Sequence, residues 1–533
     1  MSRLRLTVIA VMALALVGAN VLLYQAFWGE DDDRPIGIPG AGPGEHDRAP
    51  RTKPQPTTCE PPPRAAARPA KPPARAATGR GDFNGDGYPD VHLNAWYRPK
   101  EGGGWLHNRS LLLGSAKGPG RSVSLSTRAR GLEPKHQFRD LTGSSVNQFT
   151  GDLDRDGHAD LLIRTPRTDG RDRSWTDQRI LWGDGKLTSP TSLRLPADRA
   201  PVQAAGDFDG NGALDLVAVR EGQLLGVFYE GVARKTHCVE IQYGPFSRTG
   251  QPDHTQSFDG SQQGWLAPDE SYGLFVGDFD GDRRDDLVTR SFLSRGGEDE
   301  DGPPYESMQV PAGLQDTRFY RGGREGLGLA AVPPGISGPQ TAALAQDREA
   351  ELRDKDRRLL CAGHFDQDRY ADLLQRDGTV LHGSPAGPGP RGTKTLPAVE
   401  DDTTMGACPR VPGADLNGDG ADDLITSDPD DTPAGGVLVR LSRPDGYDEA
   451  LRIDRDGLKI RGGSPKFPSD EDKLGWDVAG ADLDKDGYAE LLIGYRGFFK
   501  PREEHGYYVI PGTADGPDLK RARFLPVREL GVG

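Results

Sequence analysis

Apolar and polar positions recur along this chain in one arrangement. A short apolar segment precedes nine residues rich in Asp and Gly, and a second short apolar segment follows, such as 161–166 (LLIRTP) or 491–495 (LLIGY). Short apolar runs bounded by acidic and glycine turn residues are typical of strands joined by tight loops. The pattern predicts an all-β fold of many short strands, and a composition with 72 Gly, 44 Pro and 35% hydrophobic residues agrees with it.

The nine-residue segment occurs seven times. Loops 1 to 7 are DFNGDGYPD (82–90), DLDRDGHAD (152–160), DFDGNGALD (207–215), DFDGDRRDD (278–286), HFDQDRYAD (364–372), DLNGDGADD (415–423) and DLDKDGYAE (482–490). Position 2 is always Phe or Leu, position 9 is always an acid, and the next residue is always aliphatic. Each loop therefore has an apolar side chain on either side that can anchor it in a core.

The spacing of oxygen-bearing residues suits a calcium ion. Side chains at positions 1, 3 and 5, a backbone carbonyl at position 7 and a carboxylate at position 9 can surround one hard cation, and Gly at position 6 permits the tight turn. An EF-hand would need Glu at position 12, where these copies carry other residues. The predicted ligands are Asp82, Asn84, Asp86, Tyr88, Asp90, Asp152, Asp154, Asp156, His158, Asp160, Asp207, Asp209, Asn211, Ala213, Asp215, Asp278, Asp280, Asp282, Arg284, Asp286, Asp366, Asp368, Asp372, Asp415, Asn417, Asp419, Ala421, Asp423, Asp482, Asp484, Asp486, Tyr488 and Glu490.

The copies differ in their fit to calcium. Loop 4 has Arg283 at the turn position but keeps its acids, so we expect it to bind, whereas loop 5 (364–372) has His364 at position 1 and Arg369 at position 6 and is expected to be weak or empty. We therefore expect about five to seven Ca²⁺ ions. The alternative is a set of metal-free turns, since Asp, Asn and Gly favour turns anyway. An acid at position 9 in all seven copies favours the metal.

The net charge of −15 supports the same interpretation. The seven loops contain 26 of the 81 Asp and Glu residues, and the remainder of the chain has more basic than acidic residues. The acidity is therefore concentrated where a cation is expected, and it does not indicate an acidic surface for basic partners. We expect no nucleic-acid partner.

The N-terminus predicts membrane targeting. Arg3 and Arg5 precede an apolar run from Leu6 to Trp28, which is long enough to cross a bilayer of ~30 Å with the C-terminal side outside. A cleaved signal peptide ending near residues 17–19 is the alternative. We favour an anchor in residues 1–29, because the apolar run continues through 21–28 (VLLYQAFW). Either interpretation predicts an extracytoplasmic protein.

Residues 30–75 are rich in Pro, Ala and Arg and predict a disordered, extended linker. The four cysteines are Cys59, Cys238, Cys361 and Cys408, and outside the cytoplasm they can form disulfides. We expect a Cys361–Cys408 bridge, because both residues lie just upstream of consecutive loops. The four lack the short spacing of a zinc site.

The chain resembles the FG-GAP repeat family, whose calcium-loop repeats build the seven-bladed β-propeller of integrin alpha subunits. The most similar copy is LGWDVAGADLDKDGYAELLIGYRG (474–497), and several copies continue into second halves such as LLLGSAKGPG at 111 and VLHGSPAGPG at 380. The resemblance implies that residues 76–533 form a seven-bladed propeller with the loops on one face. Little chain precedes loop 1, so we expect a C-terminal strand such as RARFLPV to complete the ring.

The function that these features predict is non-catalytic binding or adhesion, with an extracellular protein or a glycan as ligand and a monomeric chain. The alternatives are an enzyme on a propeller scaffold, such as a polysaccharide lyase or hydrolase, and a structural protein of the cell envelope. The sequence contains no G-x-S-x-G, P-loop or H-E-x-x-H motif. The insertions at 251–273, 295–306 and 341–360, the last of which reads as a helix, are the places to seek a ligand site, but for each of them we favour an ordinary solvent-exposed insertion.

Overall fold

The structure is a computed structural model of all 533 residues. It describes residues 59–66, 81–97, 106–125, 148–168, 174–183, 191–192, 202–227, 233–259, 273–290, 317–333, 336, 359–375, 378–389, 414–427, 435–443, 446–460, 473–496 and 505–530. All of these lie in one compact unit, residues 52–533. The N-terminal apolar run, Cys408 and most of the three insertions lie outside the described residues. Among the described residues, no helix is both long and apolar enough to span a membrane.

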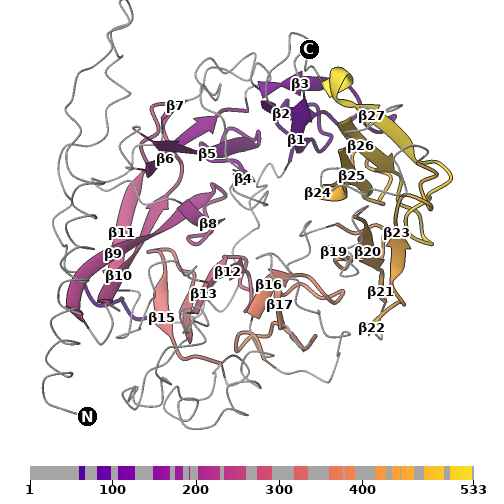
Figure 1. Ribbon diagram of the computed structural model, residues 1–533. Helices are drawn as coiled ribbons and strands as arrows, with labels where there is room; N and C mark the ends of the chain where they lie inside the picture. The colour runs from indigo at the N-terminus through magenta and orange to yellow at the C-terminus, as the bar shows by residue number, and fades with distance from the viewer. Residues whose placement is uncertain are drawn as a thin grey trace, which may run out of the picture. The chain divides into compact units, whose positions relative to one another are not determined.

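The described strands form successive antiparallel sheets, called sheets 1 to 7 in chain order (Figure 1). Sheet 1 contains β1 (Val91–Tyr97), β2 (Leu106–Leu112) and β3 (Ser122–Ser124). Sheet 2 contains β4 (Gln148–Gly151), β5 (Asp160–Thr168), β6 (Ser174–Leu181) and β7 (Thr191–Ser192). Sheet 3 contains β8 (Val202–Gly206), β9 (Asp215–Val227), β10 (Ala233–Tyr243) and β11 (His254–Asp259). Sheet 4 contains β12 (Gly273–Gly277), β13 (Asp286–Arg290), β14 (Thr317–Arg321) and β15 (Gly328–Ala330).

The C-terminal sheets follow the same plan. Sheet 5 contains β16 (Leu359–Gly363), β17 (Asp372–Gln375) and β18 (Val380–Leu381). Sheet 6 contains β19 (Leu424–Ser427), β20 (Val437–Arg440) and β23 (Leu451–Ile453), with the hairpin of β21 (Ser442–Arg443) and β22 (Gly446–Tyr447) beside it. Sheet 7 contains β24 (Lys473–Ala481), β25 (Glu490–Arg496), β26 (His505–Ile510) and β27 (Arg523–Pro526), and the 3-10 helix η3 (Val527–Leu530) follows it. The expectation of an all-β fold is confirmed.

Hydrophobic cores lie between successive sheets. Seven clusters of buried side chains join sheets 1 and 2, 2 and 3, 3 and 4, 4 and 5, 5 and 6, 6 and 7, and finally 7 and 1. In the last of these, Leu93 and Leu112 of sheet 1 pack with Leu492 and Tyr507 of sheet 7. Because a sheet of this kind is covered by neighbours on both faces, its central strand is apolar on both sides.

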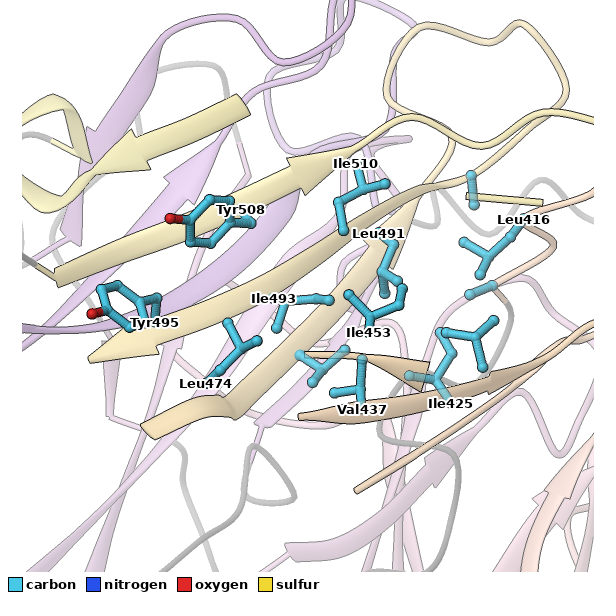
Figure 2. Close-up of a cluster of buried hydrophobic side chains, with 14 of the residues drawn as sticks. Leu416, Ile425, Val437, Ile453, Leu474, Leu491, Ile493, Tyr495, Tyr508 and Ile510 are labelled. Atoms are coloured by element: carbon cyan, nitrogen blue, oxygen red, sulfur yellow. The ribbon is translucent and has the colours of Figure 1, made fainter. Parts of the chain in front are cut away.

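Strand β25 shows why its sequence is continuously apolar. Leu491, Ile493 and Tyr495 enter the cluster shared with sheet 6, as Figure 2 shows, while Leu492 enters the cluster shared with sheet 1. Successive side chains of a strand point to opposite faces, so both faces need apolar residues here. The position-2 side chains of the loops extend the same packing, since all seven are buried. Each contributes about 1.5–3 kcal/mol of burial free energy.

Residues 59–66, which were predicted to belong to the disordered linker, are ordered against two sheets. The Asp259 amide at the end of β11 donates to the Glu60 carbonyl (2.6 Å), and the Ala65 amide donates to the Leu329 carbonyl of β15 (2.9 Å). Cys59 forms a disulfide with Cys238 of β10, a pairing that the sequence did not lead us to expect, and Cys361 is buried. The expected Cys361–Cys408 bridge involves Cys408, which lies outside the described residues.

The C-terminus contacts sheet 1 without adding a strand to it. β27 pairs with β26 as the last strand of sheet 7, so the RARFLPV segment (521–527), which was expected to complete the ring, does not pair with the described strands of sheet 1. The next residues make the contact: the Ser110 hydroxyl of β2 donates to the Leu530 carbonyl of η3 (2.9 Å).

Candidate metal-binding loops

Six of the seven loops share an unusual backbone. Positions 4 and 6 both adopt positive φ in loops 1, 2, 3, 4, 6 and 7, as Gly85 (72°) and Gly87 (89°) do in loop 1. Where the sequence lacks Gly, the loop still imposes this conformation, on Arg155 (64°), Arg283 (70°) and Lys485 (59°). A side chain at such a φ is strained. The surrounding contacts must therefore hold the turn in place.

Backbone amides hold the acidic side chains in these turns. In loop 1, Asp82 accepts the amides of Gly85 (2.7 Å) and Gly87 (2.8 Å), and Asp86 accepts that of Tyr88 (2.9 Å). The bond from the position-6 amide to the position-1 carboxylate recurs in loops 2, 3, 4, 6 and 7. The oxygen-bearing side chains at positions 1, 3 and 5 are thereby held within the turn.

The acid at position 9 joins each loop to its own sheet. In loop 2, Asp160 is fully buried, and it accepts the amides of Leu153 at position 2 (2.8 Å) and of Gly183 after β6 (2.8 Å). The first of these bonds recurs in every loop except loop 4, and the second in every loop except loop 7. Each carboxylate oxygen has a second lone pair, so this role is compatible with the predicted role as a metal ligand.

Position 8 joins each loop to the preceding one. The Ala159 amide of loop 2 donates to the Asp82 carbonyl of loop 1 (2.7 Å), and equivalent bonds connect every later loop to its predecessor. Loop 1 has Pro89 at this position, which has no N–H to donate to loop 7. A second kind of bond connects those two repeats: the Ser115 amide donates to the Leu483 carbonyl of loop 7 (2.9 Å), as the Gly323 amide donates to the Phe208 carbonyl of loop 3 (3.0 Å).

A glycine permits the close approach of neighbouring repeats. A Cβ on Gly114 would lie 2.2 Å from the Pro89 carbonyl oxygen and 2.6 Å from that of Leu483, so only glycine fits. Gly183, Gly244, Gly322, Gly383 and Gly512 occupy equivalent positions with similar contacts, and Ser442 replaces the glycine in the sixth repeat.

The donor sets fit a divalent cation. Oxygens of three acids converge within 4.8 Å in loops 2, 3, 4 and 7: Asp152, Asp154 and Asp156; Asp207, Asp209 and Asp215; Asp278, Asp280 and Asp282; and Asp482, Asp484 and Glu490. In loops 1 and 6 position 3 is Asn84 or Asn417, whose amide oxygens serve equally well. All the predicted ligands lie within the described residues, and each set is gathered in its own turn.

Two of the loops contain a buried carboxylate oxygen at which a cation would be favourable. Asp207 Oδ1 in loop 3 and Asp286 Oδ2 in loop 4 are buried without a hydrogen-bond partner. Burial is the largest cause that raises the pKa of Asp207 to about 6 and that of Asp160 to about 8, and neighbouring carboxylates contribute to both increases. A cation among these oxygens would favour the charged carboxylates and remove the cost of burying them.

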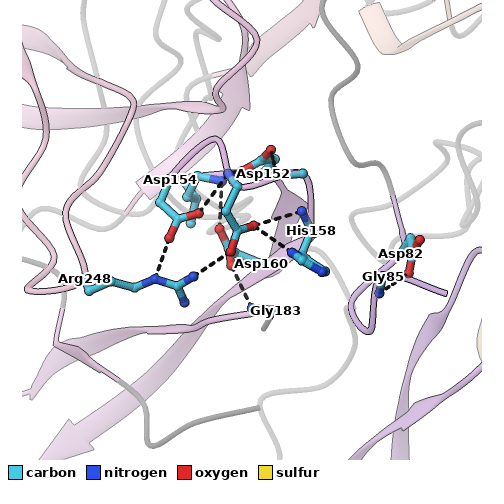
Figure 3. A network of polar contacts seen from close by, with 11 residues as sticks. Asp82, Gly85, Asp152, Asp154, His158, Asp160, Gly183 and Arg248 are labelled. Atoms are coloured by element: carbon cyan, nitrogen blue, oxygen red, sulfur yellow. Dashed lines mark hydrogen bonds and ion pairs between the residues drawn. The ribbon is translucent and has the colours of Figure 1, made fainter. Parts of the chain in front are cut away.

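In loop 2, an arginine from the next repeat forms ion pairs with two acidic side chains (Figure 3). Arg248 places Nε 2.6 Å from Asp154 Oδ2 and a terminal nitrogen 2.6 Å from Asp156 Oδ2, while its guanidinium lies 4.9 Å from the centre of the Trp182 ring. The Arg248 side chain is 44% exposed. A metal ion at loop 2 would therefore compete with a guanidinium that can move into solvent.

Two arginines, one from β14 and one from loop 4 itself, meet buried acids of loop 4. Arg321, the last residue of β14, places Nε 2.8 Å from Asp280 Oδ2, and Arg284 at position 7 places a terminal nitrogen 3.2 Å from Asp282 Oδ2. Both aspartates are buried. These guanidinium groups already neutralise part of the charge that was predicted to hold calcium.

Loop 5 departs from the other six in its backbone. Gln367 and Arg369, at positions 4 and 6, do not adopt the positive φ of the other copies. His364 Nδ1 donates to the Tyr370 carbonyl (3.0 Å), so positions 1 and 7 bind each other. His382, the residue after β18, instead meets the acids of this loop: its Nδ1 lies 2.8 Å from Asp366 Oδ2 and 3.5 Å from Asp372 Oδ1.

Sequence reasoning missed three nitrogen-bearing side chains from outside the loops, those of Arg248, Arg321 and His382. Two of them could have been found by aligning the residue that precedes the glycine of each repeat. That residue is Leu113, Trp182, Tyr243, Arg321, His382, Leu441 and Pro511 in turn, so only the fourth and fifth repeats have a basic side chain there. Arg248 has no such signal, because it lies beyond this alignment in the turn after β10.

Comparisons with known proteins identify the repeats. The family model described as FG-GAP-like repeat matches residues 152–218, and the model described as FG-GAP repeat matches residues 474–509. No curated protein matches the chain. Among solved structures, a chain of the Tc holotoxin pore of Photorhabdus luminescens is 15% identical, with a TM-score of 0.29. The similarity covers 85% of this chain and 14% of that one, so no argument about fold or function rests on it.

Proposed function

Because the chain is a protein of FG-GAP repeats, we propose that residues 76–533 form a calcium-stabilised, seven-bladed β-propeller outside the cytoplasm that binds a protein or glycan ligand without catalysis. The observation that carries the architecture is the relation between the first and last sheets. Their shared hydrophobic cluster and the bond from the Ser115 amide to the Leu483 carbonyl repeat the contacts between consecutive sheets. Seven sheets with this relation form a ring, which protects their edges.

Calcium is the cation that we propose for the loops. The candidate ligands are the carboxylate and amide oxygens of positions 1, 3 and 5 with the backbone carbonyl of position 7, a donor set that suits a hard ion. We propose binding in loops 1 to 4, 6 and 7. Loops 2 and 4 would bind more weakly, because Arg248 and Arg321 must be displaced there.

Calcium would act on stability rather than on chemistry. Extracellular calcium modules have dissociation constants of ~10⁻⁴ to 10⁻³ M, so millimolar calcium contributes on the order of 1 kcal/mol per site. Five or six sites would add about 5–6 kcal/mol, which is comparable to a typical free energy of unfolding. The Cys59–Cys238 disulfide supports an extracytoplasmic location, where such bridges form and persist.

Equilibrium dialysis and thermal unfolding test the calcium part of this proposal. We expect five or six bound ions in millimolar calcium and a large fall in melting temperature in chelator. Asp82→Ala should remove one ion and lower the melting temperature in calcium. Asp253→Ala is the matched control, because this exposed aspartate lies outside the loops. No bound ion, or an unchanged ion count in Asp82→Ala, would contradict the assignment.

The binding role is tested separately. The calcium-loaded protein is screened against glycans and extracellular proteins, and a ligand that dissociates on chelation supports the proposal. A polysaccharide that is cleaved during the screen would instead show an enzyme. A chain that binds neither class but assembles with itself would show a structural role in the cell envelope.

A further inference from the structure

Loop 5 carries a set of ligands that differs in kind from the other loops. Its position-1 residue is His364, and the bond from that imidazole to the Tyr370 carbonyl ties up the two positions that begin and end a calcium turn. A second histidine, His382, approaches from the end of β18 and faces the acids at positions 3 and 9. No other repeat has a metal-binding side chain at this place in its sheet.

The three donor atoms form a compact set. His382 Nδ1 lies 2.8 Å from Asp366 Oδ2 and 3.5 Å from Asp372 Oδ1, and all three atoms lie within 4.8 Å of one another. Ligands about 2.0–2.2 Å from a tetrahedral zinc ion are about 3.3–3.6 Å apart. The observed separations lie close to this range, so an ion fits with small side-chain movements.

The surroundings hold these donors in place. The His382 side chain is 6% exposed, and Asp372 is fully buried. Asp372 accepts the amides of Phe365 (2.9 Å) and Gly383 (2.8 Å), which fixes its orientation and makes it the rigid member of the set. Asp366 is 26% exposed and gives an ion access from solvent.

We propose that Asp366, Asp372 and His382 form a transition-metal site that takes Zn²⁺ or a similar ion in place of calcium. An imidazole with two carboxylates is a ligand set typical of zinc, whereas calcium takes oxygen ligands. Three protein ligands leave a fourth position for water or for a donor atom of a bound partner. The site is separate from the six calcium loops, and its existence does not depend on calcium binding there.

Zinc titration of the full protein in millimolar calcium tests this site. We expect one Zn²⁺ per chain above any weakly bound ions, and Co²⁺ in its place should show the visible absorption of a tetrahedral centre. His382→Gln should weaken this binding by about tenfold or more, and so should Asp366→Asn. His364→Gln should leave it unchanged, because that histidine lies in the same loop but faces the Tyr370 carbonyl.

Each result decides the matter. If His382→Gln binds zinc as the unaltered protein does, the ion is adventitious and the site does not exist. If the unaltered protein binds no zinc, His382 is only an ion-pair partner of the two aspartates. The calcium count and melting temperature of both histidine variants show that they are folded. If those values change in His382→Gln, the zinc affinity of Asp366→Asn decides instead.

Discussion

The buried acid at position 9 gives the sharpest test of how these loops are held. Asp160 accepts two buried backbone amides, those of Leu153 and Gly183, each at 2.8 Å. Asp160→Ala leaves both amides without an acceptor, and each unsatisfied buried group costs about 1–3 kcal/mol. The expected loss is therefore about 2–6 kcal/mol of the free energy of unfolding, even in chelator.

Denaturant unfolding in chelator and in calcium measures this loss. Asp156→Ala is the control, because this residue of the same loop accepts the exposed amide of His158, which water can satisfy. Asp160→Asn should lower the free energy of unfolding by an intermediate amount, because its side-chain amide keeps one acceptor oxygen. If Asp160→Ala costs no more than Asp156→Ala, the reasoning is refuted. A larger loss in calcium than in chelator would show that Asp160 also ligates the ion.

Three further predictions concern pH, packing and charge. Burial raises the pKa of Asp423 and of Glu490 to about 7, so between about pH 4.5 and 7 the folded apoprotein binds more protons than the unfolded chain. In chelator the melting temperature of the apoprotein should consequently fall as the pH rises across this range, and calcium should make this fall smaller. A melting temperature that rises with pH in chelator would contradict this prediction. Gly114→Ala should lower the free energy of unfolding by about 1–3 kcal/mol, because its Cβ would overlap two carbonyl oxygens. Gly389→Ala should lower it little, because a Cβ there meets no atom within 4 Å. Equal denaturation midpoints for the two variants would contradict the close approach of the first and last repeats. Arg321→Leu should strengthen calcium binding at loop 4, seen as one more ion at limiting calcium, and an unchanged ion count would mean that Arg321 does not compete.

The sequence by itself determined each loop and the start of the strand that follows it. The amide bonds within loop 1, such as that from Gly87 to Asp82, span at most seven residues, whereas Asp90 also accepts the Gly114 amide from 24 residues away. The nine-residue pattern therefore contains most of what the turn needs. The buried side chain at position 2 was predictable for the same reason. Loop 5 could be set apart from the other copies because its differences lie within the pattern.

Only the tertiary structure decided what meets each loop from outside. Arg248 reaches Asp156 across 92 residues, and Cys59 reaches Cys238 across 179. Likewise, Ser110 meets Leu530 across 420 residues. These contacts depend on which sheets pack together, and a local pattern of acids and glycines does not contain that information. The same local turn can therefore hold an arginine in one repeat, a histidine in another, and open oxygen ligands elsewhere.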